Sequence, residues 1–404
     1  MKKYIKDYLE KNEEIIGKIK YAPMNILCAF FPMKKEILLE SHPDLACNTF
    51  QLYKYMISVG LNKEYKITWM VNESNHFFSN EKNVSFIDIN PTGVLNRILF
   101  YIRANRAAAI ITSNRHVGKM YTSRKQLNVY LDHGSHLKAM ANVNGRKIVS
   151  CGYLLSQSEF FVKYNLQEYV VNKEQIFCAG LPRNDVFFHS NTNSIEKLIP
   201  DLSNYQKVII WVPTFRQHMS TTRIDCDFSM PLGIPILYNE NDVQKLNALL
   251  IDRKILLIIK PHPAQNMHLI KDMKCSNIRF VVNDDLVRAG IQTNELLAQT
   301  DAMITDYSSI YYDYLLADKP IAITLDDYDA YENQKGFVFD DPLSILKGEY
   351  IYSLTDLISF VNNVADGRDV AKDARNEIKN MTHDYQDGKS SERVYQFIIS
   401  HLKV

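Results

Sequence analysis

Residues 301–324 read DAMITDYSSIYYDYLLADKPIAIT, and this stretch decides the fold class. Two short apolar runs, at 302–304 and 321–324, have the length and composition of buried strands. The residues at 310–317 have helical spacing and lie between these runs. A strand, a helix and a second strand in such a short segment form a βαβ unit, whose two strands run parallel. The stretch therefore predicts a parallel sheet covered by helices.

The same alternation continues along the whole chain and predicts two doubly wound, Rossmann-like α/β halves. Further strands are expected at 26–31, 67–71, 84–87, 107–112, 128–131, 153–156, 208–212, 255–259 and 278–282. Helices are expected at 45–59, 94–105, 242–252, 293–299, 355–365 and 390–402. The polar residues 190–196 mark the expected boundary between the halves.

Composition excludes several classes of protein. The 404 residues suit two domains, and 47 Lys and Arg against 46 Asp and Glu leave a net charge of +1, so we expect no nucleic-acid partner. The six cysteines form no C-x-x-C pair, which predicts reduced thiols rather than disulfides or a zinc site. Without a signal peptide or a run of about 18 apolar residues, we expect a soluble cytoplasmic protein whose membrane contact is peripheral.

The first candidate binding segment follows the strand at 302–304. Thr305 and Asp306 end that strand, and Ser308 and Ser309 are expected to open the next helix. Backbone N–H groups at a helix start, with two hydroxyls beside them, form an anion site that suits a pyrophosphate. An ordinary helix cap explains the same residues equally well.

A second segment, Lys260 to Pro263 (KPHP), places His262 between two prolines at a strand end. Because proline fixes the backbone, the imidazole should project in a defined direction, and this favours a functional over a structural histidine. Such a ring can donate to a phosphoryl oxygen or protonate a leaving group. Lys260 would add positive charge, or be a solvated strand residue.

A third segment, DHGSHLK, begins at Asp132 and also follows a strand. Gly134 permits a tight turn that exposes His133, the candidate base. Asp132 is not expected to orient this ring, because neighbouring strand residues point to opposite faces. A metal site made of Asp132, His133 and His136 is disfavoured, since the spacing lacks a third ligand from a helix.

Three more segments carry cations or hydroxyls that suit phosphate. Arg183 in GLPRND and Arg216 in PTFR each follow a strand and a proline, and guanidinium groups bind phosphate in a bidentate manner. Surface salt bridges are equally compatible with both. Lys389, Ser390 and Ser391 combine a turn with a helix start, so they form either part of a phosphate site or a plain cap.

Taken in order, these segments resemble the CDP-glycerol glycerophosphotransferase family of teichoic acid and capsule polymer synthesis, along nearly the whole chain. The segments that carry the resemblance are 40–48 (ESHPDLACN), 133–134 (HG), 137–138 (LK), 180–185 (GLPRND), 213–216 (PTFR), 261–263 (PHP), 305–309 (TDYSS), 336–337 (GF) and 387–393 (DGKSSER). The resemblance implies a GT-B fold, with two Rossmann-like domains facing across a cleft. It predicts an acceptor-side domain at 1–189, a CDP-donor domain at 190–385, and a C-terminal helix at 386–404 that returns to the first domain.

The resemblance also implies the chemistry. The donor would be CDP-glycerol or a similar CDP-alditol, with no tightly bound cofactor and an open metal requirement. Glycerol phosphate would pass to a lipid-linked or glycan acceptor at the inner membrane face, with release of CMP. His133 would act as the base, and His262 would help hold the pyrophosphate. The donor-binding residues would be Arg183, Thr214, Arg216, Lys260, Thr305, Asp306, Ser308, Ser309, Lys389, Ser390 and Ser391.

The chain departs from the family on the acceptor side, which leaves the acceptor open. Members usually have Trp before the first histidine and Thr-Pro after the glycine, whereas this chain has Asp132, Ser135 and His136. With Lys138, these residues form the predicted acceptor side. Residues 97–106 predict an interfacial helix or a core helix with a cationic edge. The alternatives in function are a GT-B glycosyltransferase or epimerase that uses a UDP-sugar, and a non-catalytic binding protein.

Overall fold

The computed structural model describes residues 22–23, 26–28, 30–114, 126–139, 148–149, 152–189, 195–214, 230–262 and 275–403. The chain divides into two compact units. The first comprises Met1–His133, Lys147–Asp185 and Asp387–Val404, and the second comprises Gly134–Arg146 and Val186–Gln386. Each unit is built on its own parallel sheet.

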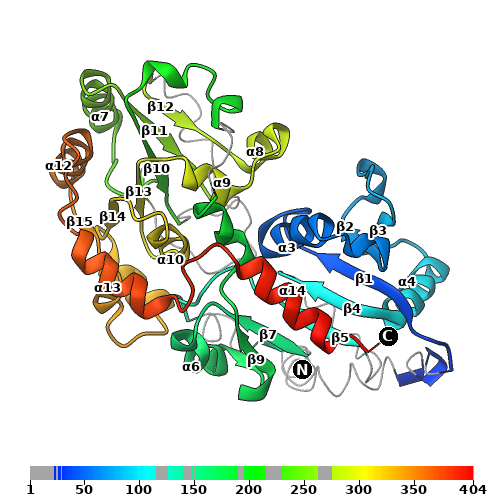
Figure 1. Ribbon diagram of the computed structural model, residues 1–404. Helices are drawn as coiled ribbons and strands as arrows, with labels where there is room; N and C mark the ends of the chain where they lie inside the picture. Colours follow the sequence, from blue (N-terminus) through cyan, green and yellow to red (C-terminus); the bar gives the residue numbers. More distant parts are fainter. Residues whose placement is uncertain are drawn as a thin grey trace, which may run out of the picture. The chain divides into compact units, whose positions relative to one another are not determined.

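The first unit has a seven-stranded parallel sheet in the order β3-β2-β1-β4-β5-β7-β9 (Figure 1). Its strands are β1 (Lys34–Glu40), β2 (Lys66–Val71), β3 (Val84–Asp88), β4 (Ala107–Thr112), β5 (Leu127–Tyr130), β7 (Tyr153–Ser156) and β9 (Ile176–Cys178). A separate two-stranded sheet pairs β6 (Ile148–Val149) with β8 (Tyr169–Val170). The helices are α3 (Cys47–Ser58), α4 (Val94–Arg106), α6 (Glu159–Glu168) and α14 (Ser390–His401).

The last helix, α14, packs in the first unit although it closes the chain. Its apolar residues Val394 and Ile398 are fully buried in the same cluster as Leu52 of α3 and Trp69 of β2. The Phe397 ring stacks on Phe177 of β9, with 3.8 Å between ring centroids. These apolar contacts attach the C-terminal helix to the first sheet.

The second unit has a six-stranded parallel sheet in the order β12-β11-β10-β13-β14-β15. Its strands are β10 (Lys207–Val212), β11 (Ile255–Ile259), β12 (Ile278–Phe280), β13 (Ala302–Thr305), β14 (Ile321–Thr324) and β15 (Glu349–Ile351). The helices are α7 (Glu240–Asp252), α8 (Asn283–Ala289), α9 (Thr293–Ala298), α10 (Ile310–Leu315), α11 (Tyr328–Lys335), α12 (Leu354–Ala365) and α13 (Lys372–Thr382). β11 is buried throughout, as a parallel strand covered on both faces must be.

The first strand is not where the sequence predicted it. Residues 26–28 are helical, and the Ile26 side chain is 63% exposed. β1 instead contains Ile37, Leu38 and Leu39, which are fully buried because this strand pairs with both β2 and β4. The apolar run at 26–31 resembles a strand in composition alone, and Pro32 follows it directly.

The first unit ends at Asp185 and resumes at Asp387, close to the predicted boundaries, but residues 134–146 belong to the second unit. Residues 137–139 lie antiparallel to 336–338 in the second unit. The Leu137 carbonyl accepts the Val338 N–H, and the Ala139 N–H donates to the Gly336 carbonyl. These backbone bonds explain why residues 134–139 belong with the second sheet.

Over the residues that the structure describes, no helix combines the length and the apolar character needed to span a bilayer.

Candidate active site

The candidate base His133 lies three residues beyond the end of β5. The residues before it are fixed from α3, where the Asn48 side-chain amide donates to the Leu131 carbonyl (3.0 Å) and the Asp132 carbonyl (2.9 Å). Asn48 is fully buried, so this connection between β5 and α3 is protected from water. The His133 side chain is 59% exposed. A rigid backbone thus presents an accessible imidazole at the carboxyl end of a parallel strand, where ligands of α/β folds bind.

Asp132 contacts the His133 ring, so the expectation that it could not orient this ring is wrong. Asp132 Oδ1 lies 3.1 Å from His133 Nδ1 and also accepts the His133 backbone N–H (2.6 Å). The physical reason is that Asp132 lies beyond the strand, with φ of 54° in the left-handed region. The alternation of a strand does not apply there. This conformation costs an aspartate about 1 kcal/mol.

Tyr169 completes this cluster, and no local sequence pattern indicates it. Its hydroxyl donates to Asp132 Oδ2 at 2.8 Å, and both residues are buried. Tyr169 opens β8, 37 residues after Asp132, and reaches it only through the packing of the first unit.

Arg183 lies beside His133 in the first unit. Its backbone N–H donates to Asn48 Oδ1 (3.1 Å), and Nη1 donates to the His133 carbonyl and contacts Cys47 Sγ (3.4 Å). Arg183 therefore stabilises the backbone conformation of the candidate base. Its role in donor binding remains a prediction.

Opposing effects act on the pKa of His133. Desolvation lowers it, but the hydrogen bond and charge of Asp132, with the Ser113 carbonyl, outweigh desolvation and the Arg183 charge. The net result is a pKa above the ordinary histidine value. The ring is therefore a stronger base than a free imidazole.

In the second unit, the ends of β10 and β13 are held together by Thr214, Thr305 and Asp306. The Asp306 carboxylate accepts the Thr214 backbone N–H (2.9 Å) and hydroxyl (2.9 Å), and the Thr305 hydroxyl donates to the Val212 carbonyl (3.0 Å). All three side chains are buried. Their protein bonds give them a structural role in joining β10 to β13, and their contact with the donor stays a prediction.

Ser308 and Ser309 lie just beyond this junction, at the predicted helix start. Ser309 is the N-cap of α10, yet its side chain makes no capping hydrogen bond to that helix. Both serines are partly exposed. Their hydroxyls thus stand at the carboxyl end of β13 in the position predicted for a phosphate contact.

Lys260 and His262 follow β11. Lys260 is 6% exposed, and its ammonium donates to Asn283 Oδ1 at 2.9 Å. Desolvation lowers its pKa to about 8, and no acidic side chain in the described part of the chain forms an ion pair with it. A buried cation without an anion favours an anionic ligand. The His262 side chain is exposed, as predicted.

The helix start at Ser390 and Ser391 is already occupied by a carboxylate. Asp185 accepts both backbone N–H groups at 2.8 Å, and the serine side chains are buried in the first unit. Asp185 thus takes the place of an anion at this helix start, as in a plain cap, and contact of Ser390 and Ser391 with a phosphate stays a prediction. Lys389 beside them is exposed. Arg216 lies outside the described residues.

The remaining acceptor-side residues are anchored to the second unit. Ser135 and His136 are buried, and the Lys138 ammonium lies over the Tyr331 ring, 5.6 Å from its centroid. Contact of Ser135, His136 and Lys138 with the acceptor stays a prediction. Over the described residues, no three His, Cys, Asp or Glu side chains gather as a metal site.

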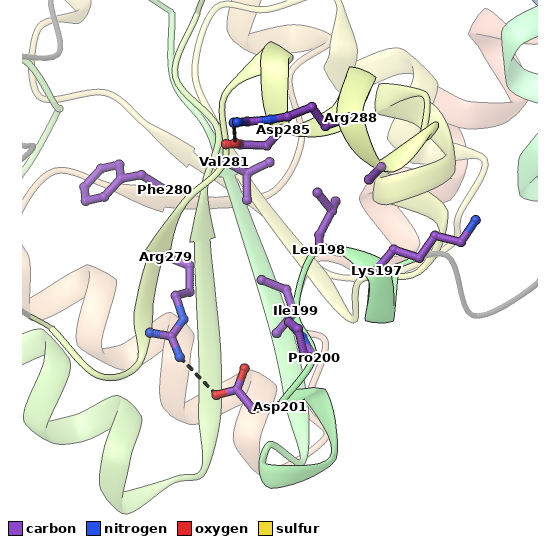
Figure 2. A pocket seen from close by; sticks show the side chains of 11 residues that line it. Lys197, Leu198, Ile199, Pro200, Asp201, Arg279, Phe280, Val281, Asp285 and Arg288 are labelled. Carbon is purple, nitrogen blue, oxygen red and sulfur yellow. Dashed lines mark hydrogen bonds and ion pairs between the residues drawn. The ribbon is translucent and has the colours of Figure 1, made fainter.

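A cavity of about 570 Å³ lies elsewhere in the second unit (Figure 2). Its apolar middle, with Val281, is flanked by two ion pairs. Arg279 contacts Asp201 at 3.0 Å, and Arg288 contacts Asp285 at 2.6 Å. Each guanidinium already has its carboxylate, and the cavity contains none of the predicted site residues.

The chain is similar in sequence to known teichoic acid enzymes. The chain is 28% identical over 253 residues to the teichoic acid glycerol-phosphate primase of Bacillus subtilis (strain 168). The aligned residues are 62% of this chain and 58% of that protein. The chain is 21% identical over 396 residues to the teichoic acid glycerol-phosphate transferase of Staphylococcus aureus (strain NCTC 8325 / PS 47), covering 92% and 95%. The chain spans only 45–59% of the length of the first three curated relatives that it matches.

Among solved structures, the wall teichoic acid polymerase TagF superposes with a TM-score of 0.72 at 18% identity, over 96% of this chain and 98% of that one. The fold is therefore GT-B. The profile of the family described as CDP-Glycerol:Poly(glycerophosphate) glycerophosphotransferase matches residues 24–400, which include both sheets and both candidate histidines. The chain belongs to this glycerophosphotransferase family.

Proposed function

We propose that this protein transfers glycerol phosphate, or a related alditol phosphate, from CDP-glycerol to a lipid-linked or glycan acceptor. CMP is released, and the product is a teichoic acid or capsule-like polymer. The observation that carries the proposal is the family match over residues 24–400. This match also disfavours the alternative of a UDP-sugar transferase or epimerase.

In the proposed reaction, an acceptor hydroxyl attacks the β-phosphorus of CDP-glycerol. The new P–O bond forms as the bond from the β-phosphorus to the bridging oxygen breaks, and CMP leaves with that electron pair. The hydroxyl proton passes to His133. Such transfers depend mainly on positioning and electrostatics, with general base help adding roughly 10²–10⁴-fold.

The second unit supplies groups that suit the negatively charged donor. The buried Lys260 ammonium offers a desolvated positive charge, and the Ser308 and Ser309 hydroxyls offer neutral donors. A buried charge interacts with phosphate more strongly than a solvated one, because water screens it less. We assign these three residues, with His262, to the pyrophosphate.

Product analysis tests the proposal. The protein is incubated with a synthetic glycerol-phosphate acceptor and CDP-glycerol, CDP-ribitol or a UDP-sugar, and CMP release and product mass are measured. We expect CMP and products heavier by whole alditol-phosphate units, which also counts the units added. Turnover of the UDP-sugar alone, or of no donor, would contradict the proposal.

We further propose that the protein reaches a lipid-linked acceptor by binding the membrane surface through the start of α4. Three exposed apolar side chains stand there, Val94 (75%), Leu95 (68%) and Leu99 (54%), next to Arg97. Apolar residues with a nearby cation suit the interface of an anionic bilayer. Arg103, which the sequence suggested for this role, is instead bound to buried Glu36 at 2.6 Å.

Vesicle sedimentation tests the membrane proposal. Leu95→Glu and Leu99→Glu should each weaken binding to vesicles of phosphatidylglycerol and phosphatidylcholine. Val287→Glu, at a position 68% exposed on α8 of the second unit, serves as the control. Equal binding by all variants would exclude α4 as the contact surface.

A further inference from the structure

A buried hydrogen-bonded chain stands behind the candidate base. Tyr169 Oη donates to Asp132 Oδ2 (2.8 Å), and Asp132 Oδ1 lies 3.1 Å from His133 Nδ1. We infer that Asp132 and Tyr169 are positioning residues, which hold the His133 ring with Nε2 toward the acceptor hydroxyl. The inference rests on the proposed function, because it assigns roles within the step that removes the acceptor proton.

The geometry determines which ring nitrogen can act as the base. A carboxylate only accepts hydrogen bonds, so the nitrogen beside Asp132 carries the proton. Nδ1–H therefore donates to Asp132, and Nε2 keeps a lone pair for the acceptor proton. The hydroxyl of Tyr169 holds the second carboxylate oxygen, so that the carboxylate cannot easily rotate away from the ring.

The distribution of burial agrees with this division of roles. Asp132 and Tyr169 are 6% and 2% exposed, whereas the His133 side chain is 59% exposed. Burying a carboxylate is costly unless polar groups compensate for its lost hydration. This cost is added to that of the left-handed backbone at Asp132, and the Tyr169 hydroxyl and the His133 ring provide the compensating polar contacts.

Several helices and strands contribute charged or titratable groups around the hydrogen-bonded chain of Tyr169, Asp132 and His133. Asp132 follows β5, and Arg183 comes from the segment after β9 and acts on His133 with the opposite sign. Tyr130, at the end of β5, hydrogen-bonds Tyr169. Glu40 of β1 and Cys47 of α3 act electrostatically on Tyr130.

A purely structural role for Asp132 makes a different prediction. Its Oδ1 also accepts the His133 backbone N–H, so Asp132 could serve only to shape the turn. Asp132→Asn would then preserve that turn and leave the protonation of the ring unchanged. The titration of His133 therefore distinguishes a positioning role of Asp132 from a purely structural one.

The experiment compares wild type with Asp132→Asn, Tyr169→Phe and the control Tyr153→Phe. NMR titration of the His133 imidazole, assigned with His133→Asn, is combined with the pH dependence of kcat for CMP release. Tyr153 is a suitable control because its ring packs edge-on against Phe397 of α14 in the same unit.

Asp132→Asn should lower the titration midpoint of His133 and move the acid limb of kcat to lower pH. We also expect kcat to fall at least roughly tenfold, with KM for CDP-glycerol unchanged. Tyr169→Phe should shift the midpoint upward, since the carboxylate then concentrates its charge on the ring, and should lower kcat roughly two- to tenfold. Tyr153→Phe should match wild type.

A midpoint and acid limb that are the same in Asp132→Asn and wild type would overturn the inference. If Asp132→Asn fails to fold, Tyr169→Phe decides, and an unchanged midpoint in that variant overturns the inference too. If wild type releases no CMP from any CDP-alditol, the proposed function fails. The NMR titration still measures whether Asp132 and Tyr169 control His133.

Discussion

The carboxyl ends of β5 and β11 each present a histidine, but the charge beside it has opposite sign. After β5, buried Asp132 contacts His133 and raises its pKa. After β11, buried Lys260 precedes His262, and desolvation lowers the lysine pKa to about 8. A buried anion prepares a ring to take up a proton, and a buried cation prepares a pocket for phosphate. We propose that these two positions serve different tasks, His133 as the base and Lys260 with His262 as contacts to phosphate.

Replacing the first histidine should have the largest effect. His133→Asn should lower kcat for CMP release roughly 10²–10⁴-fold, because the acceptor proton loses its base. CMP affinity, measured by calorimetry, should stay the same. His76→Asn, at an exposed histidine of the first unit, is the control. Full activity of His133→Asn would show that His133 is not the base, and the proposed difference between the ends of β5 and β11 would then be wrong.

Replacing the buried cation should act on the donor instead. Lys260→Met should weaken CMP binding roughly tenfold, since a hydrogen bond from a charged group is lost. The affinity of wild type for CMP should fall as pH rises through about 8, because Lys260 of the ligand-free protein then loses its proton. Lys260→Met should lack this dependence.

Calorimetric titrations at pH 7 and pH 9 measure both effects. Lys245→Met, at an exposed position of α7, is the control and should retain wild-type affinity and its pH dependence. Wild-type affinity that is equal at the two pH values would show that Lys260 does not bind the donor.

The smallest effect concerns the clamp that supports the second strand end. Thr214→Val removes the hydroxyl that donates to Asp306 and keeps the backbone N–H that also does. We expect a loss of about 1 kcal/mol in the free energy of unfolding, measured with urea. Thr355→Val, at an exposed position of α12, should change it less. Equal losses in both variants would show that the Thr214 hydroxyl is not part of a stabilising clamp.

Local sequence was enough for most of the fold. β4, β7, β11 and β14 begin and end at the predicted residues, because a strand buried on both faces needs a short, unbroken apolar run. The run at 26–31 meets the same criterion, yet its residues 26–28 are helical. Hydrophobicity alone cannot tell a run that pairs with two neighbours from one that stays at the surface.

The sequence predicted the site less completely, because parts of it depend on distant contacts. His133 could be proposed as a candidate from its place after a strand. Its partner Asp132 could not, since a left-handed backbone brings the two side chains together. Tyr169 reaches Asp132 only through tertiary packing, and Asp185 occupies the start of α14 from more than 200 residues away.

The central claim is that this protein moves an alditol phosphate from a CDP donor with His133 as the base. Single-turnover CMP release from CDP-glycerol, with wild type and His133→Asn at equal donor saturation, tests it most directly. We predict rapid CMP release by wild type only when the acceptor is present, and release slower by roughly 10²-fold or more by the variant. Equal rates in the two proteins, or no CMP release by wild type, would contradict the account.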